Sequence, residues 1–247
     1  MGKIIVYTQT LDPAVLEQAL EGYELVLTAG RSELVEAVVR ESDLQGLIFQ
    51  KQELEAADRA FLASLKKCFP ILALAVISGK QAEALPPGAA SIDGESGGLT
   101  EEIDGFAAAI SLSNRREHQR FDWPLQGALS TDEKQWQSFP IRSLSAGGAF
   151  LVCPSGCPEA GTEAGLRILF QDFQIRTRCR VLDPRQASSH LPAGFGVRFT
   201  ELSDRGRELV DRIIHDALVE VLLAPEQEPN LPTLDQNELV PGDFELF

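Results

Sequence analysis

The sequence lacks the long apolar runs, the leader pattern and the cysteines that would place it in a membrane or outside the cell. No apolar run approaches the roughly 18–20 residues of a membrane-spanning helix, and the polar start, Met1-Gly2-Lys3, does not resemble a secretory signal. Four cysteines in 247 residues are too few for a disulfide framework. We therefore expect a cytoplasmic protein with no membrane insertion, folded around an apolar core.

Signatures of enzymes and of metal sites are also missing. Ser143 and Ser145 lie in no Gly-x-Ser-x-Gly elbow, and no acidic pair has a context typical of hydrolases. Cys153 and Cys157 are spaced like half of a metal site, but no second Cys/His pair matches them, so ordinary thiols are the expectation. The sequence predicts no enzyme, no cofactor and no bound metal.

Positive charge is scarce and unevenly distributed. The net charge is −15, and residues 1–110 hold 8 Lys/Arg against 17 Asp/Glu. Residues 111–223 hold 14 of each sign, with 13 arginines among the basic ones, and residues 224–247 hold six acidic residues and no basic one. Because the acidic remainder repels a polyanion, the Arg-rich segment favours a small anionic ligand over a nucleic-acid duplex.

The first part of the chain, residues 1–112, alternates between strand and helix periods. Apolar runs predict strands at 3–8, 23–27, 46–50, 70–76 and 89–92 and helices at 13–20, 32–40, 54–67 and 100–112. Repeated alternation of this kind implies a doubly wound parallel sheet of the flavodoxin type, covered on both faces.

This alternation resembles the response-regulator receiver domain. The chemistry of a receiver is missing, because Gln50 lies where the phosphorylated carboxylate would be and Thr8-Gln9-Thr10 lies where the acidic pair would be. An amide is neither a nucleophile nor a good anchor for a divalent cation. The resemblance implies a pseudo-receiver that binds a protein partner or a second copy of the chain, and a scaffold without any ligand is the open alternative.

Residues 113–223 change to a strand-rich pattern. Short β-prone runs predict strands at 125–130, 136–144, 148–153, 166–170, 173–182 and 195–200, followed by a helix over 203–223. This is typical of a six-stranded antiparallel β-barrel with a C-terminal helix. Within the fifth run, strict alternation puts Arg176, Arg178 and Arg180 on the outer face, as a solvated stripe or as the border of a ligand site.

Three arginines stand just ahead of these strands, at positions 115, 116 and 120. A guanidinium is planar, permanently charged and forked, so it can bind two phosphate oxygens or both acceptors on a guanine edge. Arg115, Arg116 and Arg120 therefore indicate an anionic, guanine-bearing ligand. The alternative is that they cap the preceding helix, since cations are favourable at a helix C-terminus.

A small turn about twenty residues later supplies complementary groups. Ser143 and Ser145 are hydroxyl residues two positions apart, and the pair Gly147-Gly148 follows them. Because glycine has no Cβ, backbone and hydroxyl donors in such a turn can come close to a ligand.

Together, Arg116-x-x-x-Arg120 and Ser143-x-Ser145-x-x-Gly148 resemble the paired signature of PilZ domains, the bacterial receptors for cyclic di-GMP. Gly196-Val197-Arg198-Phe199 is similar to the last barrel strand of that family. The resemblance implies a non-catalytic receptor for cyclic di-GMP, which changes the arrangement of the domains or partner binding. The implied ligand-binding residues are Arg115, Arg116, Arg120, Ser143, Ser145, Gly147, Gly148 and Arg198.

Two positions modify what the resemblance implies. Ser143 replaces an Asp or Asn that accepts a hydrogen bond from guanine, and losing one charge-assisted bond costs about 1.5–3 kcal/mol. Ser143 thus leaves open a PilZ-like adaptor that works by protein contacts without a ligand. Arg115 resembles the members that take up an intercalated cyclic di-GMP dimer, which implies two ligands per chain. A homodimer is left open.

Residues 224–247 form an acidic tail with a hydrophobic end, Phe244-Glu245-Leu246-Phe247. Its composition argues against independent folding. The tail is therefore either solvated or docked on the protein, where it would compete with an anionic ligand for arginines.

Overall fold

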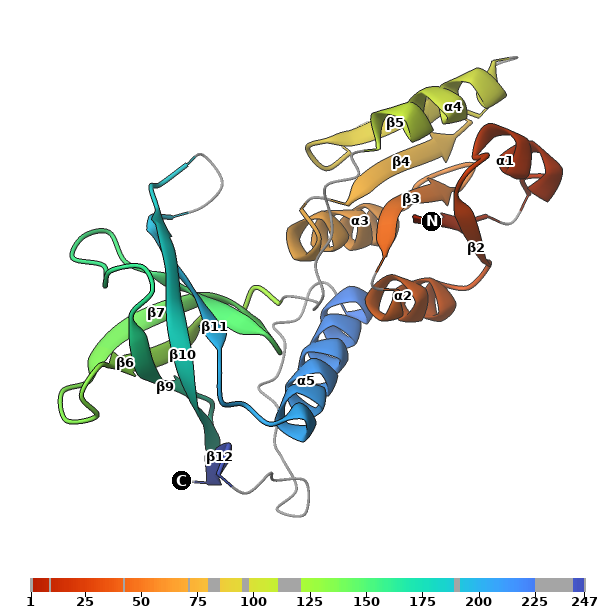
Figure 1. The fold of residues 1–247 in the computed structure, drawn as a ribbon. Coiled ribbons are helices and arrows are strands. Elements are labelled where there is room, and N and C mark those ends of the chain that lie inside the picture. Colours follow the sequence, from red (N-terminus) through yellow and green to blue (C-terminus); the bar gives the residue numbers. More distant parts are fainter. Residues whose placement is uncertain are drawn as a thin grey trace. The chain divides into compact units, whose positions relative to one another are not determined.

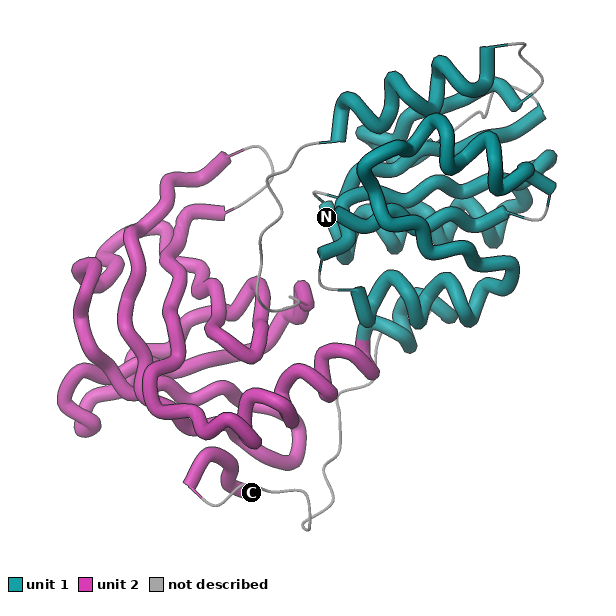
Figure 2. The backbone as a smooth tube through the Cα atoms, turned by 45° about the vertical axis from the view of Figure 1, so that its right-hand side comes forward, with its two compact units in different colours: residues 1–117, 218–228 teal, residues 118–217, 229–247 magenta. Residues whose placement is uncertain are grey.

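The computed structural model describes residues 2–8, 10–41, 43–70, 72–79, 85–94, 98–110, 121–188, 192–224 and 242–246. The chain divides into two compact units, residues 1–117 with 218–228 and residues 118–217 with 229–247 (Figure 2). Among the described residues, no helix combines the length and the apolar character needed to cross a membrane.

The first unit is built on a five-stranded parallel sheet (Figure 1). Its strands are β1 (Lys3–Tyr7), β2 (Glu24–Thr28), β3 (Leu44–Gln50), β4 (Ala73–Ser78) and β5 (Ala89–Asp93). They lie in the order β2-β1-β3-β4-β5, and every neighbouring pair is parallel. This is the flavodoxin-like strand order. The predicted doubly wound sheet is confirmed.

Three helices connect strands of this unit, namely α1 (Pro13–Ala19), α2 (Arg31–Arg40) and α3 (Ala56–Cys68), and α4 (Leu99–Ala109) follows β5. Helix α1 begins as its sequence predicts, because the Asp12 carboxylate accepts a hydrogen bond from the Ala14 amide at 2.9 Å and Pro13 occupies the first helical position. Helices α1 and α4 pack together over one face of the sheet, where Leu16 and Ile103 join one buried apolar cluster.

Strand alternation supplies a second buried layer on the opposite face of that sheet. Phe49 at the end of β3 stacks on Tyr7 with ring centroids 4.6 Å apart, and it meets Phe61 of α3 at 6.1 Å. Helix α2 contributes Leu34 and Val38, both fully buried. The sheet is thus covered on both faces, as its nearly continuous apolar strands require.

The second unit contains a closed antiparallel barrel of six strands. They are β6 (Leu125–Ser130), β7 (Gln137–Ser145), β8 (Gly148–Val152), β9 (Glu163–Leu169), β10 (Phe173–Arg185) and β11 (Gly194–Phe199). The strands follow one another as β11-β8-β7-β6-β9-β10, and pairing of β10 with β11 closes the barrel. Helix α5 (Asp204–Leu223) follows. The predicted barrel and C-terminal helix are confirmed.

The long strand β10 shows how the sequence pattern builds this barrel. Ile175, Cys179 and Val181 are buried, whereas Arg178 and Arg180 between them are exposed. The predicted alternation of an apolar inner face and an arginine-bearing outer face is therefore confirmed.

The end of the acidic tail is docked on the barrel. Strand β12 (Phe244–Leu246) pairs antiparallel with Phe173–Ile175 of β10. Of the two arrangements left open by composition, docking is the one found for residues 242–246.

Candidate functional site

The turn between β7 and β8 holds four of the predicted ligand-binding residues. Ser143 pairs with Phe150 and Ser145 pairs with Gly148 across the two strands. The Ser145 hydroxyl donates a hydrogen bond to the Gly148 carbonyl oxygen at 3.1 Å, which closes the turn over Gly147. Both serine side chains are largely buried. The turn is therefore an ordered part of the barrel.

Gly148 is required by the barrel itself. A Cβ built at this position would lie 2.0 Å from the Val197 carbonyl oxygen of β11, closer than two such atoms can approach. The sequence pattern predicted that glycine here leaves room for a ligand. The structure gives a different reason, which is the close approach of two strand backbones.

A row of cross-strand neighbours runs from this turn over four strands. Ser145 lies opposite Gly148, Gly148 opposite Arg198, and Arg198 opposite Arg180. Directly opposed residues in a ladder project to the same face, and the exposure of Arg198 and Arg180 shows that it is the outer one. We call Ser145, Gly148, Arg198 and Arg180 the barrel row.

The two arginines of the barrel row differ from their neighbours in charge pairing. Arg178 lies 3.5 Å from Glu133 and 3.7 Å from Glu201, and Arg176 pairs with Glu245. Within the described part of the chain, no such ion pair involves Arg180 or Arg198. Like charges that face each other across strands are unfavourable. Glu163 lies directly opposite Arg180 on its other side, in β9. The barrel row thus offers a bound anion two guanidinium groups, of which Arg198 has no carboxylate opposite it on β8 or β10.

The chain enters the barrel beside this row. Phe121 forms a two-hydrogen-bond bridge with Leu144, at 2.9 and 3.0 Å, between Ser143 and Ser145. The next residue, Asp122, pairs with Arg142 at 2.9 Å. This entry was not predicted, although the opposite charges of Asp122 and Arg142 were a signal that the sequence offered.

An aromatic cluster holds this entry in place. Trp123 makes edge-to-face contacts with Phe121 at 4.8 Å and with Phe170 at 5.8 Å. Such pairs add roughly 0.5–1.5 kcal/mol to area burial. Phe121 is therefore fixed beside Ser143 and Ser145 by its hydrogen bonds to Leu144 and by its packing against Trp123.

The structure brings together five of the eight predicted ligand residues. Ser143, Ser145, Gly147, Gly148 and Arg198 all lie at the β7–β8 turn or on the strand beside it, and Gly147 accepts a hydrogen bond from the Phe199 amide at 3.0 Å. Arg115, Arg116 and Arg120 lie outside the described residues. Arg120 is bonded to Phe121, so it is joined directly to the anchored entry of the barrel.

In the first unit, the three residues Thr8, Thr10 and Gln50, which were compared above with a receiver's acidic site, form a neutral hydrogen-bonded network. The Thr8 hydroxyl donates to Gln50 Oε1 at 2.9 Å, and Gln50 Nε2 donates to the Thr10 hydroxyl at 2.7 Å. The same Thr8 hydroxyl accepts a hydrogen bond from the Leu11 amide at 2.9 Å. These groups satisfy one another, and none of them is a metal-binding carboxylate.

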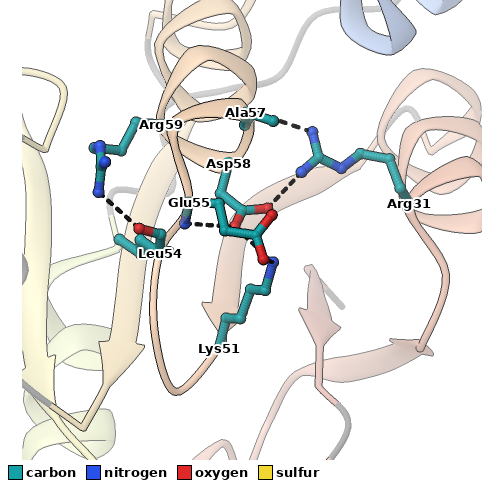
Figure 3. A network of polar contacts seen from close by, with 7 residues as sticks. All are labelled: Arg31, Lys51, Leu54, Glu55, Ala57, Asp58 and Arg59. Atoms are coloured by element: carbon teal, nitrogen blue, oxygen red, sulfur yellow. Dashed lines mark hydrogen bonds and ion pairs between the residues drawn. The ribbon is translucent and has the colours of Figure 1, made fainter.

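The carboxylate of Asp58, at the start of α3, is also fully hydrogen-bonded by its neighbours. Its side chain is only 3% exposed and accepts hydrogen bonds from Arg31 at 2.6 Å, Lys51 at 2.7 Å and the Glu55 amide at 2.9 Å (Figure 3). Burial raises the pKa of Asp58, but the hydrogen bonds and the charges of Lys51 and Arg31 outweigh it and hold the pKa below its ordinary value. Asp58 therefore joins α3 to Arg31 and Lys51 as an anion at neutral pH.

The described residues contain no cluster of three or more His, Cys, Asp or Glu side chains suited to a metal ion. Cys153 and Cys157 hydrogen-bond to nearby backbone carbonyls. Burial, together with the neighbouring Cys157, raises the pKa of Cys153 to about 11. At neutral pH this thiol is therefore protonated.

A comparison with known families decides the identity of the second unit. Residues 114–216 match the family described as PilZ domain. These residues form a PilZ domain. The match spans the arginine segment, the β7–β8 turn and most of α5, so the PilZ resemblance of the two sequence motifs is confirmed.

Solved structures similar to the chain include a PilZ domain and an inhibitor of motility. One is the PilZ domain of Escherichia coli YcgR with c-di-GMP, at 15% identity, covering 46% of this chain and 98% of that one, with a TM-score of 0.38. Another is the Bacillus subtilis inhibitor of motility MotI/DgrA, at 18% identity, 40% and 49% coverage and a TM-score of 0.36. The chain thus spans about half the length of that protein. No curated protein matches the chain.

Proposed function

We propose that the chain is a non-catalytic receptor for cyclic di-GMP. The observation that carries this proposal is the barrel row of the PilZ domain, where Arg180 and Arg198 face each other beside the Ser/Gly turn. An anionic ligand placed there gains two guanidinium partners and reduces their mutual repulsion, which Glu163 opposite Arg180 offsets on one side only. The arginine segment is attached to the barrel beside the same turn, through Phe121.

Each predicted ligand residue has a role in this proposal. Arg116 and Arg120 bind phosphate oxygens and a guanine edge, for which a forked guanidinium is suited. The Ser143 hydroxyl takes the place of the family's carboxylate or amide as acceptor. Arg115 stacks on the base of a second ligand, so that two molecules bind as an intercalated dimer.

The response of the protein follows from the position of the arginine segment between the two predicted domains, residues 1–112 and 113–223. Ligand binding orders this segment and thereby fixes the arrangement of the domains. A partner protein reads the change through the receiver-like domain, whose own candidate site is filled by the Thr8, Gln50 and Thr10 network. Residues 224–247 follow these two domains as a tail, whose end at residues 242–246 is docked on the barrel.

One observation favours a second function, a ligand-independent adaptor. Ser143 is neutral and largely buried, so it offers guanine a shorter and weaker acceptor than a carboxylate. In an adaptor, the barrel serves protein contacts alone.

Isothermal titration of cyclic di-GMP into the purified chain tests the receptor. We expect binding at micromolar affinity or tighter, lost in Arg116→Ala and in Arg120→Ala. Arg40→Ala is the control, because Arg40 lies on the surface of α2, where its ion pair within the described residues is with Glu36. No heat at high ligand concentration would establish the adaptor instead. Saturation at one ligand per chain would refute the role of Arg115.

A further inference from the structure

Strand β12 pairs with the first half of strand β10, at an edge that β11 does not cover. The second half of β10, from Cys179 to Arg185, pairs with β11 and closes the barrel. The first half, Phe173–Ile175, has an edge beyond the barrel closure, and β12 adds to this edge. The Arg176 amide continues the ladder by donating to the Asp243 carbonyl oxygen at 2.8 Å. The barrel is therefore complete without β12, which adds to it as a seventh strand.

A recess at the start of α5 receives the first carboxylate of the docked segment. Asp243 is only 7% exposed, and its Oδ2 accepts hydrogen bonds from the Ser203 hydroxyl at 2.5 Å and the Ser203 amide at 3.2 Å. The Ser203 hydroxyl also accepts from the Gly206 amide, which links the recess to the positive end of the helix. A Cβ on Gly206 would lie 2.5 Å from Asp243 Oδ2. Glycine thus leaves room for this carboxylate.

An aromatic contact and a basic pair receive the next two residues. Phe244 is buried against Phe173 with ring centroids 6.1 Å apart. Glu245 accepts a hydrogen bond from Gln174 at 2.7 Å and pairs with Arg176. Arg167, directly opposite Arg176 on β9, adds positive charge at the same place.

Arg167 is oriented by a neighbouring aromatic ring. Its guanidinium lies over the Trp136 ring at 4.0 Å, which fixes its orientation. Its buried Nε has no hydrogen-bond partner in the described structure. The arginine is held in place by Trp136. Hydrogen bonds from Arg176 and Gln174 lower the pKa of Glu245, and the charge of Arg167 adds to this effect.

We propose that this edge of β10 is a recognition site for an extended acidic–aromatic–acidic peptide of a partner protein. The chain's own Asp243-Phe244-Glu245 is its resident occupant. Addition of a strand to an open sheet edge is a general mode of peptide recognition, in which main-chain hydrogen bonds give affinity and side-chain contacts give specificity. Here the carboxylate recess, the Phe173 ring and the basic pair specify three successive residues.

The resident segment is tethered by residues 225–241, which separate it from α5. A fully extended segment of this length spans roughly 55–60 Å, and binding within one chain gives effective concentrations on the order of 1 mM. A dilute free peptide therefore competes poorly with the resident segment. Cyclic di-GMP plays no part in this proposal, so failure of the peptide site and failure of the receptor are separate results.

The test uses the full-length chain with Phe244→Ala and Glu245→Lys, which removes the aromatic contact and the acidic partner from the tail. The probe is a fluorescein-labelled peptide of residues 240–247, followed by fluorescence anisotropy. We expect saturable binding to the double variant, and binding to the wild-type chain that is weaker by about 10-fold or more, because the tethered segment competes. A peptide carrying Phe244→Ala should bind the double variant about 10-fold more weakly than the native peptide.

A charge exchange identifies the site. Adding Arg176→Glu to the double variant should weaken binding of the native peptide by about 10-fold, and a peptide carrying Glu245→Arg should restore it. Three results would overturn the proposal: no binding to a folded double variant, equal binding to both chains, or a double variant that does not fold, since β12 would then belong to the core. A wild-type dimer that the double variant loses would show exchange of tails between two copies and would replace the partner peptide.

Discussion

The two candidate sites of this chain, the Thr8, Gln50 and Thr10 network and the barrel row, are opposites in how their polar groups are satisfied. In the first, each side chain is hydrogen-bonded to another neutral one. In the second, two exposed arginines face each other across strands. A polar site that satisfies itself gains little from a ligand, whereas opposed like charges gain when an anion binds. Sequence motifs alone do not reveal this difference, because it depends on which residues the ladder places side by side.

The largest expected effect is the loss of the barrel turn in Gly148→Ala. The added Cβ would collide with the Val197 carbonyl oxygen, and we expect the free energy of unfolding to fall by more than about 3 kcal/mol. Chemical denaturation of the chain without ligand measures it. The matched control is Gly105→Ala in α4, where nothing lies within 4 Å of the added Cβ. There we expect a gain of about 0.5–1 kcal/mol. Equal stability of both variants would contradict the close approach of β8 and β11.

The next effect concerns the buried anion of the first unit. Asp58→Asn leaves Arg31 and Lys51 without their carboxylate, and we expect a loss of about 2–3 kcal/mol at pH 7, reduced from fully buried pairs because both cations are partly exposed. Because the pKa of Asp58 is lowered on folding, its ionised form stabilises the fold above the unfolded-state pKa. That stability is lost as pH falls through the folded-state value.

Urea denaturation between pH 7 and pH 3 checks this prediction. The wild-type chain should lose more stability on acidification than Asp58→Asn does. Parallel pH curves for the two proteins would show that Asp58 carries no such charge interaction.

The third effect separates ligand binding from stability. We expect Arg198→Ala to weaken cyclic di-GMP binding by about 10-fold, which corresponds to about 1.4 kcal/mol. Without ligand, its unfolding free energy should stay the same or rise by up to about 0.5 kcal/mol, because the repulsion with Arg180 is removed. Arg178→Ala is the control in calorimetric titration, since Arg178 pairs with Glu133 and Glu201. A similar loss of affinity in both variants would show that the ligand contacts the arginines along the outer face of β10 in general, and not the barrel row in particular.

The smallest effect is expected at the network of the first unit. Gln50→Ala removes two hydrogen bonds and should cost about 1 kcal/mol of stability. Affinity for cyclic di-GMP should not change. Thermal denaturation and calorimetric titration of this variant check both parts, and a change in affinity would show that the first unit takes part in ligand binding.

The fold was largely predictable from the sequence, because both units have strong periodic patterns. Asp12-Pro13 predicted the start of α1, and the alternation along β10 predicted its inner and outer faces. Element ends were less certain. Strand β9 begins at Glu163, three residues before its prediction, because Glu163 and Ala164 pair with Arg180 and Cys179 although their composition is not β-prone.

The candidate site was predictable only in part. The Ser/Gly turn and Arg198 followed from motifs, but the opposition of Arg198 and Arg180 depends on register between strands far apart in sequence. The reason for Gly148 likewise depends on the position of β11. Docking of β12 could not be derived, since three residues give too short a pattern, although the alternating Phe244-Glu245-Leu246 was compatible with a strand.

Hydrogen–deuterium exchange with and without cyclic di-GMP tests the central claim most directly. We expect added protection at the β7–β8 turn, residues 143–148, and at residues 115–120, with no change at Thr8–Leu11 or Gln50. Protection confined to the first unit, or no protection anywhere at saturating ligand, would contradict a receptor site on the barrel row.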